Sequence, residues 1–119
     1  MYLMRNSIIR QVTRDHTFLQ DLIDWGDVPS ETASKHPMSH VLDQCVGCID
    51  SGIDSGDFER AAGDILILCT DGLYGVVSEK QMAEIILSTK QLSRCSAELL
   101  EAAVHGGSLD DITIVLASS

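Results

Sequence analysis

The sequence predicts an α+β domain in which helices and strands form layers, on three observations. An unbroken apolar run typical of a buried strand occurs at 65–69, and a second, mostly apolar run occurs at 112–117. Between them, apolar residues recur at helical spacing in two segments, 78–89 and 93–105. The chain has 119 residues, of which 45% are hydrophobic, so it has the size and composition of one small domain or of part of one.

The N-terminal region predicts a β-hairpin followed by a helix. Apolar residues at 2–4 and 8–9 flank Asn6 and Ser7, which suit a two-residue turn between antiparallel strands. Further on, the apolar residues of the segment 18–23 fall on one helical face, and a glycine after them ends that helix.

The region that follows predicts short elements separated by a loop. Pro29 suits the first turn of a helix over 29–36. Residues 41–46 form a candidate strand. The stretch 47–56 is rich in glycine, serine and aspartate, which predicts a loop.

The second half of the chain carries clear boundary signals. Residues 63–64 predict a turn into the first apolar strand. Ser78 and Gln81 have the spacing of a capping box, which marks the start of a helix. The next helix is expected to end at the glycine pair 106–107.

Two aspartates lie next to the two apolar strands and are the candidate metal ligands. Asp71 follows the strand 65–69, and Asp110 precedes the strand 112–117. If these strands pair antiparallel, both carboxylates lie at the same end of the sheet, where they repel each other. A hard divalent cation such as Mg²⁺ or Mn²⁺ prefers such oxygen ligands and removes that repulsion.

Charge and composition exclude several classes of protein. The formal net charge is −10, which argues against binding nucleic acid or an anionic membrane surface. No apolar stretch approaches the length of a membrane span, and the first residues lack the layout of a signal peptide. These features lead us to expect a cytoplasmic protein.

The cysteines and one histidine have ordinary structural interpretations. Cys45 and Cys48 form a CxxC pair, but no second pair completes a zinc site. Cys69 and Cys95 lie in predicted regular elements and are expected to be small buried thiols. His16 is expected to make a structural hydrogen bond near the start of a helix.

Five segments of the chain form a collinear set of motifs. They are YLMR at 2–5, TRDH at 13–16, HPMSHVLDQCVG at 36–47, GDILILCTDGL at 63–73 and GGSLDDIT at 106–113. Together they resemble, in the correct order, motifs of the bacterial PPM-type (type 2C) metal-dependent protein serine/threonine phosphatases. The resemblance spans essentially the whole chain, so residues 1–119 are expected to be the C-terminal part of one phosphatase domain.

The resemblance implies a fold, an activity and a site. The family fold is an αββα sandwich with a binuclear Mg²⁺ or Mn²⁺ centre, at which activated water hydrolyses phosphoserine or phosphothreonine in proteins. By the motif match, Asp71 and Asp110 are metal ligands, and no other catalytic residue is assigned. Gly72 and Asp111 lie next to the metals, Gly72 at the glycine that turns the chain away from the site.

The departures from the family pattern concern completeness. The motifs of the family's first half, including a bridging aspartate and a phosphate-gripping arginine, have no counterpart in this sequence. Asp111 stands where the family usually has asparagine, and one extra residue precedes Asp110. We therefore expect a partial αββα sandwich that lacks its N-terminal half, with a partial metal site.

Two functional interpretations follow. In the first, the chain is part of a serine/threonine phosphatase, inactive alone, that works with a missing N-terminal half or self-associates. In the alternative, it is a non-catalytic remnant that binds a partner without turnover. In-frame sequence encoding the first-half motifs would distinguish them.

Overall fold

The computed structural model describes residues 1–29, 36–38, 41–47, 52–89 and 91–118. The chain divides into two compact units. The first comprises residues 1–13 together with 59–119, and the second comprises residues 14–58. Each unit is described by itself below.

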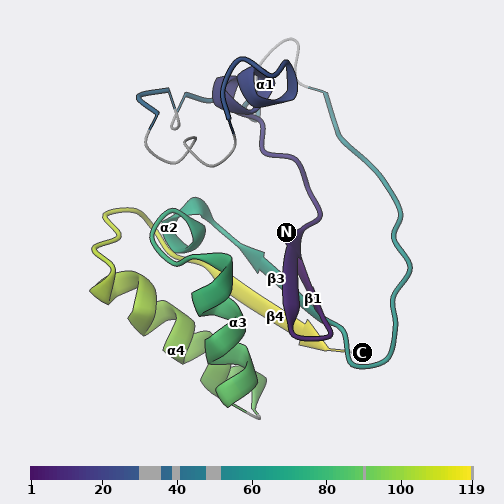
Figure 1. Cartoon of the computed structure of the whole chain (residues 1–119). Helices are drawn as coiled ribbons and strands as arrows, with labels where there is room; N and C mark the ends of the chain where they lie inside the picture. Colours follow the sequence, from purple (N-terminus) through teal and green to yellow (C-terminus); the bar gives the residue numbers. More distant parts are fainter. Residues whose placement is uncertain (30–35, 39–40, 48–51, 90, 119) are drawn as a thin grey trace. The chain divides into compact units, whose positions relative to one another are not determined.

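The first unit contains a four-stranded antiparallel sheet (Figure 1). Its strands are β1 (Tyr2–Arg5), β2 (Ile8–Gln11), β3 (Ile65–Cys69) and β4 (Ile114–Ser118). The order across the sheet is β2-β1-β3-β4, so the N-terminal hairpin pairs with a strand from the second half of the chain. The two strongest apolar runs of the sequence, β3 and β4, are direct neighbours.

The predicted hairpin is confirmed, and the conformation of its turn accounts for the residue types found there. Asn6 and Ser7 have φ angles of 52° and 67°. A type I′ hairpin turn, whose twist matches that of the strands, has positive φ at both central positions, and asparagine tolerates this conformation better than most residues. The register that follows pairs Arg5 with Ile8 across the end of the hairpin.

Three helices belong to the same unit: α2 (Asp71–Tyr74), α3 (Glu79–Ser88) and α4 (Leu92–His105). Figure 1 shows them together on one side of the sheet. Alternate strand residues and one stripe of each longer helix form a single apolar cluster. Its fully buried members are Ile67, Leu73, Met82, Leu99 and Ala103, and Tyr2 and Met4 of β1 also belong to it. The helices are therefore held by packing on one sheet face, as in other α+β layers.

The signals at the helix ends are also confirmed. The Ser78 hydroxyl accepts a hydrogen bond from the Gln81 backbone N–H, and the Gln81 side chain accepts one from the Ser78 backbone N–H. This capping box satisfies two backbone donors at the start of α3. At the far end of α4, Gly107 has a φ of +83°, a conformation that favours glycine.

The second unit contains the helix α1 (Phe18–Asp24), with Thr17 as its N-cap. The Thr17 side chain accepts a hydrogen bond from the Gln20 backbone N–H. Gly26, with a φ of +83°, lies just beyond the helix, as the sequence predicted. Arg14 is paired with Asp21 and Asp24 of the same helix.

The prediction of a strand at 41–46 was wrong. The described part of this segment makes only an isolated bridge between Leu42 and Thr17. Val41 is 41% exposed, Leu42 65% and Val46 106%. Without a neighbouring strand and an apolar surface to pack against, a short apolar run does not become a strand. Most of the predicted helix over 29–36 and part of the loop at 47–56 lie outside the described residues.

Candidate metal centre

The ends of β3 and β4 bring the two candidate ligands to one edge of the sheet. The strands are antiparallel, with Cys69 opposite Ile114. The chain leaves β3 into Asp71 and enters β4 from the turn that carries Asp110. The prediction that both aspartates lie at the same end of antiparallel strands is therefore confirmed.

Thr70 joins the two turns by three hydrogen bonds. Its backbone N–H donates to the Thr113 carbonyl oxygen at 3.2 Å. Its hydroxyl donates to the Asp111 carbonyl oxygen at 2.8 Å and accepts from the Thr113 backbone N–H at 3.0 Å. The backbone on either side of the candidate site is therefore linked directly.

Gly72 permits a close approach of the same two turns. A Cβ atom at this position would lie 2.7 Å from the Asp111 carbonyl oxygen and 3.1 Å from Cγ1 of Ile112. Gly72 is the second residue of α2, a four-residue helix that begins at Asp71. Sequence reasoning expected only a turn here, because four residues are too few to give a helical pattern.

The carboxylates themselves are accessible. Asp71, Asp110 and Asp111 are all exposed. Oδ1 of Asp110 accepts a hydrogen bond from the Asp111 backbone N–H at 2.7 Å, which holds the Asp110 side chain against its own turn. Exposed carboxylates at the ends of these strands are accessible to ions in solution and to a protein that binds at this end of the sheet.

The donor set suits part of a metal site. Carboxylate oxygens are the ligands that Mg²⁺ and Mn²⁺ prefer. Among the described residues, however, no group of three or more histidines, cysteines, aspartates or glutamates is placed to hold a metal ion. The residues present therefore fit two ligands of a larger oxygen-rich site.

The residues given structural interpretations from the sequence are placed as follows. Nε2 of His16 lies 2.8 Å from an Asp54 carboxylate oxygen, within the second unit, so its structural hydrogen bond is confirmed. Cys95 is a buried free thiol, and burial raises its pKa. Cys69 is half-buried. Cys48 lies outside the described residues, so the interpretation of the CxxC pair stays a prediction.

Sequence reasoning missed an ion pair at the opposite end of β3. Nε and a terminal nitrogen of Arg5 donate to the two carboxylate oxygens of Asp64 at 2.8 and 2.7 Å. Asp64 is 1% exposed and also accepts from the Ala61 backbone N–H. The Arg5 hydrogen bonds, and to a smaller extent the one from Ala61, lower the pKa of Asp64 to about 2. The signal in the sequence was weak, because Gly63–Asp64 is also a common turn pair.

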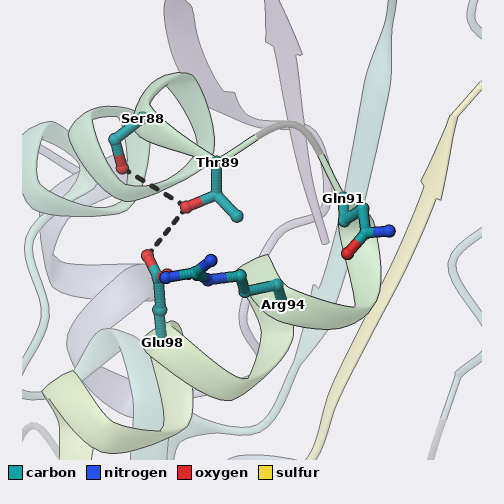
Figure 2. A pocket seen from close by; sticks show the side chains of 5 residues that line it. All are labelled: Ser88, Thr89, Gln91, Arg94 and Glu98. Carbon is teal, nitrogen blue, oxygen red and sulfur yellow. Dashed lines mark hydrogen bonds and ion pairs between the residues drawn. The ribbon is translucent and has the colours of Figure 1, made fainter.

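A pocket of about 480 Å³ lies between the end of α3 and the start of α4. Figure 2 shows side chains that line it. Its lining includes Thr89, whose hydroxyl donates to Glu98 at 2.8 Å, and Arg94, which donates to the same carboxylate at 3.0 Å. The Thr89 hydrogen bond and then Arg94 lower the pKa of Glu98. This pocket lies at the N-terminal end of α4, whereas Asp110 follows the C-terminal end, so it is separate from the candidate metal site.

None of the described helices has the length and apolar character needed to cross a membrane.

Comparison with known proteins identifies the class of this fold. The serine/threonine phosphatase stp of Listeria monocytogenes is 32% identical over 117 residues, which are 97% of this chain and 46% of that protein. The serine/threonine protein phosphatase PstP of Mycobacterium tuberculosis is 33% identical over 116 residues, or 98% of this chain and 22% of that protein. No model of a protein family matches the sequence.

Solved structures give the same result. A serine/threonine phosphatase from S. agalactiae matches with a TM-score of 0.90 and 27% identity, over 99% of this chain and 50% of that one. The catalytic domain of PstP in complex with two manganese ions matches with a TM-score of 0.84 and 31% identity, over 98% of this chain and 48% of that one.

In sequence and fold, this chain corresponds to a C-terminal portion of the PPM-type serine/threonine phosphatases. It spans about half the length, or less, of the curated relatives it matches. The α+β class and the partial phosphatase fold expected from the sequence are confirmed.

Proposed function

We propose that this chain is the C-terminal part of a metal-dependent protein serine/threonine phosphatase, which hydrolyses phosphoserine and phosphothreonine in proteins when the rest of the domain is present. The observation that carries the proposal is that Asp71 and Asp110 lie on the turns at the same end of the paired strands β3 and β4. Similarity to phosphatases, one of them bound to two manganese ions, supports it.

In this proposal Asp71 and Asp110 each contribute a carboxylate to the metal centre. The ion is Mn²⁺ or Mg²⁺, both of which take oxygen ligands. When bound, the ions lower the pKa of water and neutralise charge on the phosphoryl oxygens. Gly72 allows the turns to approach each other, and Asp111 adds a negative charge beside the site.

The same proposal predicts that the 119-residue chain alone does not turn over substrate. Two carboxylates supply only part of an octahedral ligand set, and the described residues contain no group of three histidines, cysteines, aspartates or glutamates that could hold a metal ion. Each 1.4 kcal/mol of lost stabilisation costs about tenfold in rate, so losing several metal contacts removes many decades. Hydrolysis of p-nitrophenyl phosphate with millimolar Mn²⁺ is the assay. Turnover that disappears in Asp71→Ala would contradict this expectation.

Complementation tests the activity itself. The chain is mixed with the N-terminal portion of the S. agalactiae phosphatase, the part that it does not match. We expect Mn²⁺-dependent hydrolysis of a phosphothreonine peptide from the mixture and none from either part. Activity that survives Asp71→Ala in the mixture would show that this chain does not carry the ligands.

Metal binding by the chain alone is expected to be weak and to need both aspartates. Paramagnetic relaxation of water protons during Mn²⁺ titration measures it, with Asp71→Ala/Asp110→Ala as the test. The control is Asp27→Ala/Asp57→Ala, which removes the same charge from exposed positions in the other unit. If the test variant binds Mn²⁺ as well as the control does, the site lies elsewhere.

The sheet offers a surface for the rest of the domain. Strand residues that alternate with the core face away from the helices, and among them Leu68 is 43% exposed and Val115 54%. Exposed apolar side chains on a sheet face favour association. We infer that a complementing half covers this face, and that the chain alone self-associates. Sedimentation that finds a compact monomer, with no hydrophobic-dye binding, would refute this.

A second candidate is a non-catalytic, partner-binding module. The observation that favours it is the incomplete ligand set within the described residues. Under this hypothesis the complementation mixture forms a stable complex but shows no hydrolysis at any Mn²⁺ concentration. A cytoplasmic location, and residues 1–119 as part of one domain, remain predictions of the sequence under either hypothesis.

A further inference from the structure

We propose that Thr70 is a positioning residue for the candidate metal site, because its hydroxyl fixes the turn that carries Asp110 against the turn that carries Asp71. This inference rests on the proposed function, since the site it concerns is the proposed metal centre. It adds a residue that makes no contact with the reacting groups but sets the geometry of the ligands.

The Thr70 hydroxyl does not cap the helix that follows it. Thr70 occupies the N-cap position of α2, and threonine in this position commonly accepts a hydrogen bond from the first turn of its helix. In this protein the Thr70 side chain makes no such capping hydrogen bond. Its hydrogen-bonding capacity is directed instead to the turn before β4.

The Thr70 hydroxyl instead forms two hydrogen bonds with the backbone just before β4. The hydroxyl donates to the Asp111 carbonyl oxygen at 2.8 Å and accepts from the Thr113 backbone N–H at 3.0 Å. Using both donor and acceptor capacity, one side chain ties the backbone on either side of Ile112. Residues 111 and 113 lie between Asp110 and the start of β4. The two hydrogen bonds therefore fix the position of the backbone that carries Asp110.

Gly72 provides an independent observation of the same contact. Its missing Cβ would collide with the Asp111 carbonyl oxygen, the atom that accepts the Thr70 hydrogen bond. The hydrogen bond pulls the two turns together, and the glycine makes room for them. Ligand side chains on two separate turns bind an ion well only when the backbone that carries them is held in register, a general property of outer-shell support.

The variant that tests this inference is Thr70→Val, which keeps the shape of the side chain and removes the hydroxyl. We expect Mn²⁺ binding to weaken by roughly three- to tenfold, the scale of a lost hydrogen bond or of weak outer-shell support. In the metal-free chain, exchange of the Thr113 amide hydrogen is expected to accelerate. Thr70→Ser retains the hydroxyl and is expected to preserve both properties.

The matched control is Thr89→Val. Thr89 also donates a side-chain hydrogen bond, to Glu98, but at the other end of α4. This variant loses a comparable hydrogen bond and should leave Mn²⁺ binding and Thr113 exchange unchanged. An equal loss of Mn²⁺ binding in Thr89→Val would mean that general destabilisation, and not positioning, explains the result.

The outcomes separate this inference from the function on which it rests. If the unmodified chain shows no Mn²⁺ binding that depends on the two aspartates, the proposed metal centre fails, and the inference fails with it. If the unmodified chain binds Mn²⁺ and Thr70→Val binds it equally well, only the inference is overturned. A loss of binding in Thr70→Ser as large as in Thr70→Val would also overturn it.

Discussion

Replacing Gly72 with alanine directly tests the close approach at the candidate site. Gly72 is buried, and the added Cβ would lie 2.7 Å from the Asp111 carbonyl oxygen. That oxygen belongs to the backbone and already accepts a hydrogen bond from Thr70. The clash therefore cannot be relieved by rotating a side chain, and one of the two turns has to move.

Two opposing effects determine the size of the change. Overpacking of a tightly packed position typically costs about 1–3 kcal/mol. Alanine is favoured over glycine inside a helix by roughly 1 kcal/mol, and position 72 lies within α2. Subtracting the second effect from the first gives a loss of about 0–2 kcal/mol, with about 1 kcal/mol as the central value. For a typical urea m value of about 1–3 kcal/mol/M, the midpoint falls by roughly 0.3–1 M.

Urea unfolding followed by circular dichroism measures this loss. The control is Gly56→Ala, because a Cβ at Gly56 would meet nothing within 4 Å. The control should change the free energy of unfolding by about 0.5 kcal/mol or less. Faster exchange of the Thr113 amide hydrogen in Gly72→Ala, but not in the control, would locate the change at the turns. A Gly72→Ala chain more stable than the unmodified chain would show that no clash occurs at this position and that helix propensity alone accounts for the effect.

Two further predictions concern stability elsewhere in the first unit. Because the pKa of Asp64 is lowered to about 2 from an ordinary value of 3.8, its stabilising contribution is complete above pH 3.8 and is lost as the pH falls toward 2. Unfolding midpoints measured between pH 2 and pH 5 should therefore fall more steeply for the unmodified chain than for Asp64→Asn, and equal slopes would contradict the Arg5–Asp64 pair. Ser78→Ala removes the capping box of α3 and should cost about 1 kcal/mol, whereas Ser93→Ala, in the exposed first turn of α4, should change little. Equal effects in these two variants, measured by thermal unfolding, would show that the cap does not stabilise the helix.

Features encoded over a few neighbouring residues could be predicted from the sequence. The Asn6–Ser7 turn follows from residues that tolerate positive φ between two apolar runs. The capping box at Ser78 follows from a three-residue spacing. The apolar runs predicted β3 and the strand before the C-terminus, although the observed β4 begins two residues later than the expected 112–117 strand, at Ile114.

Other features depended on partners that are distant in the chain. The segment 41–46 has the composition of a strand, but strand formation needs a neighbouring strand, and it makes only one bridge. The Arg5–Asp64 pair joins residues 59 positions apart, and no local pattern signals it. These outcomes are set by tertiary contacts that local propensity does not contain.

For the candidate site, local sequence was enough to predict which carboxylates lie beside the two apolar strands. Their shared sheet edge could be predicted because Asp71 and Asp110 lie at the end of one strand and the start of the other. How the two turns are joined, through the Thr70 hydroxyl and the close approach at Gly72, depends on tertiary contacts. Strand and turn signals act between neighbouring residues, so they can be read from the local sequence. The Thr70 contact links groups about 40 residues apart in the chain, which only sheet pairing brings together.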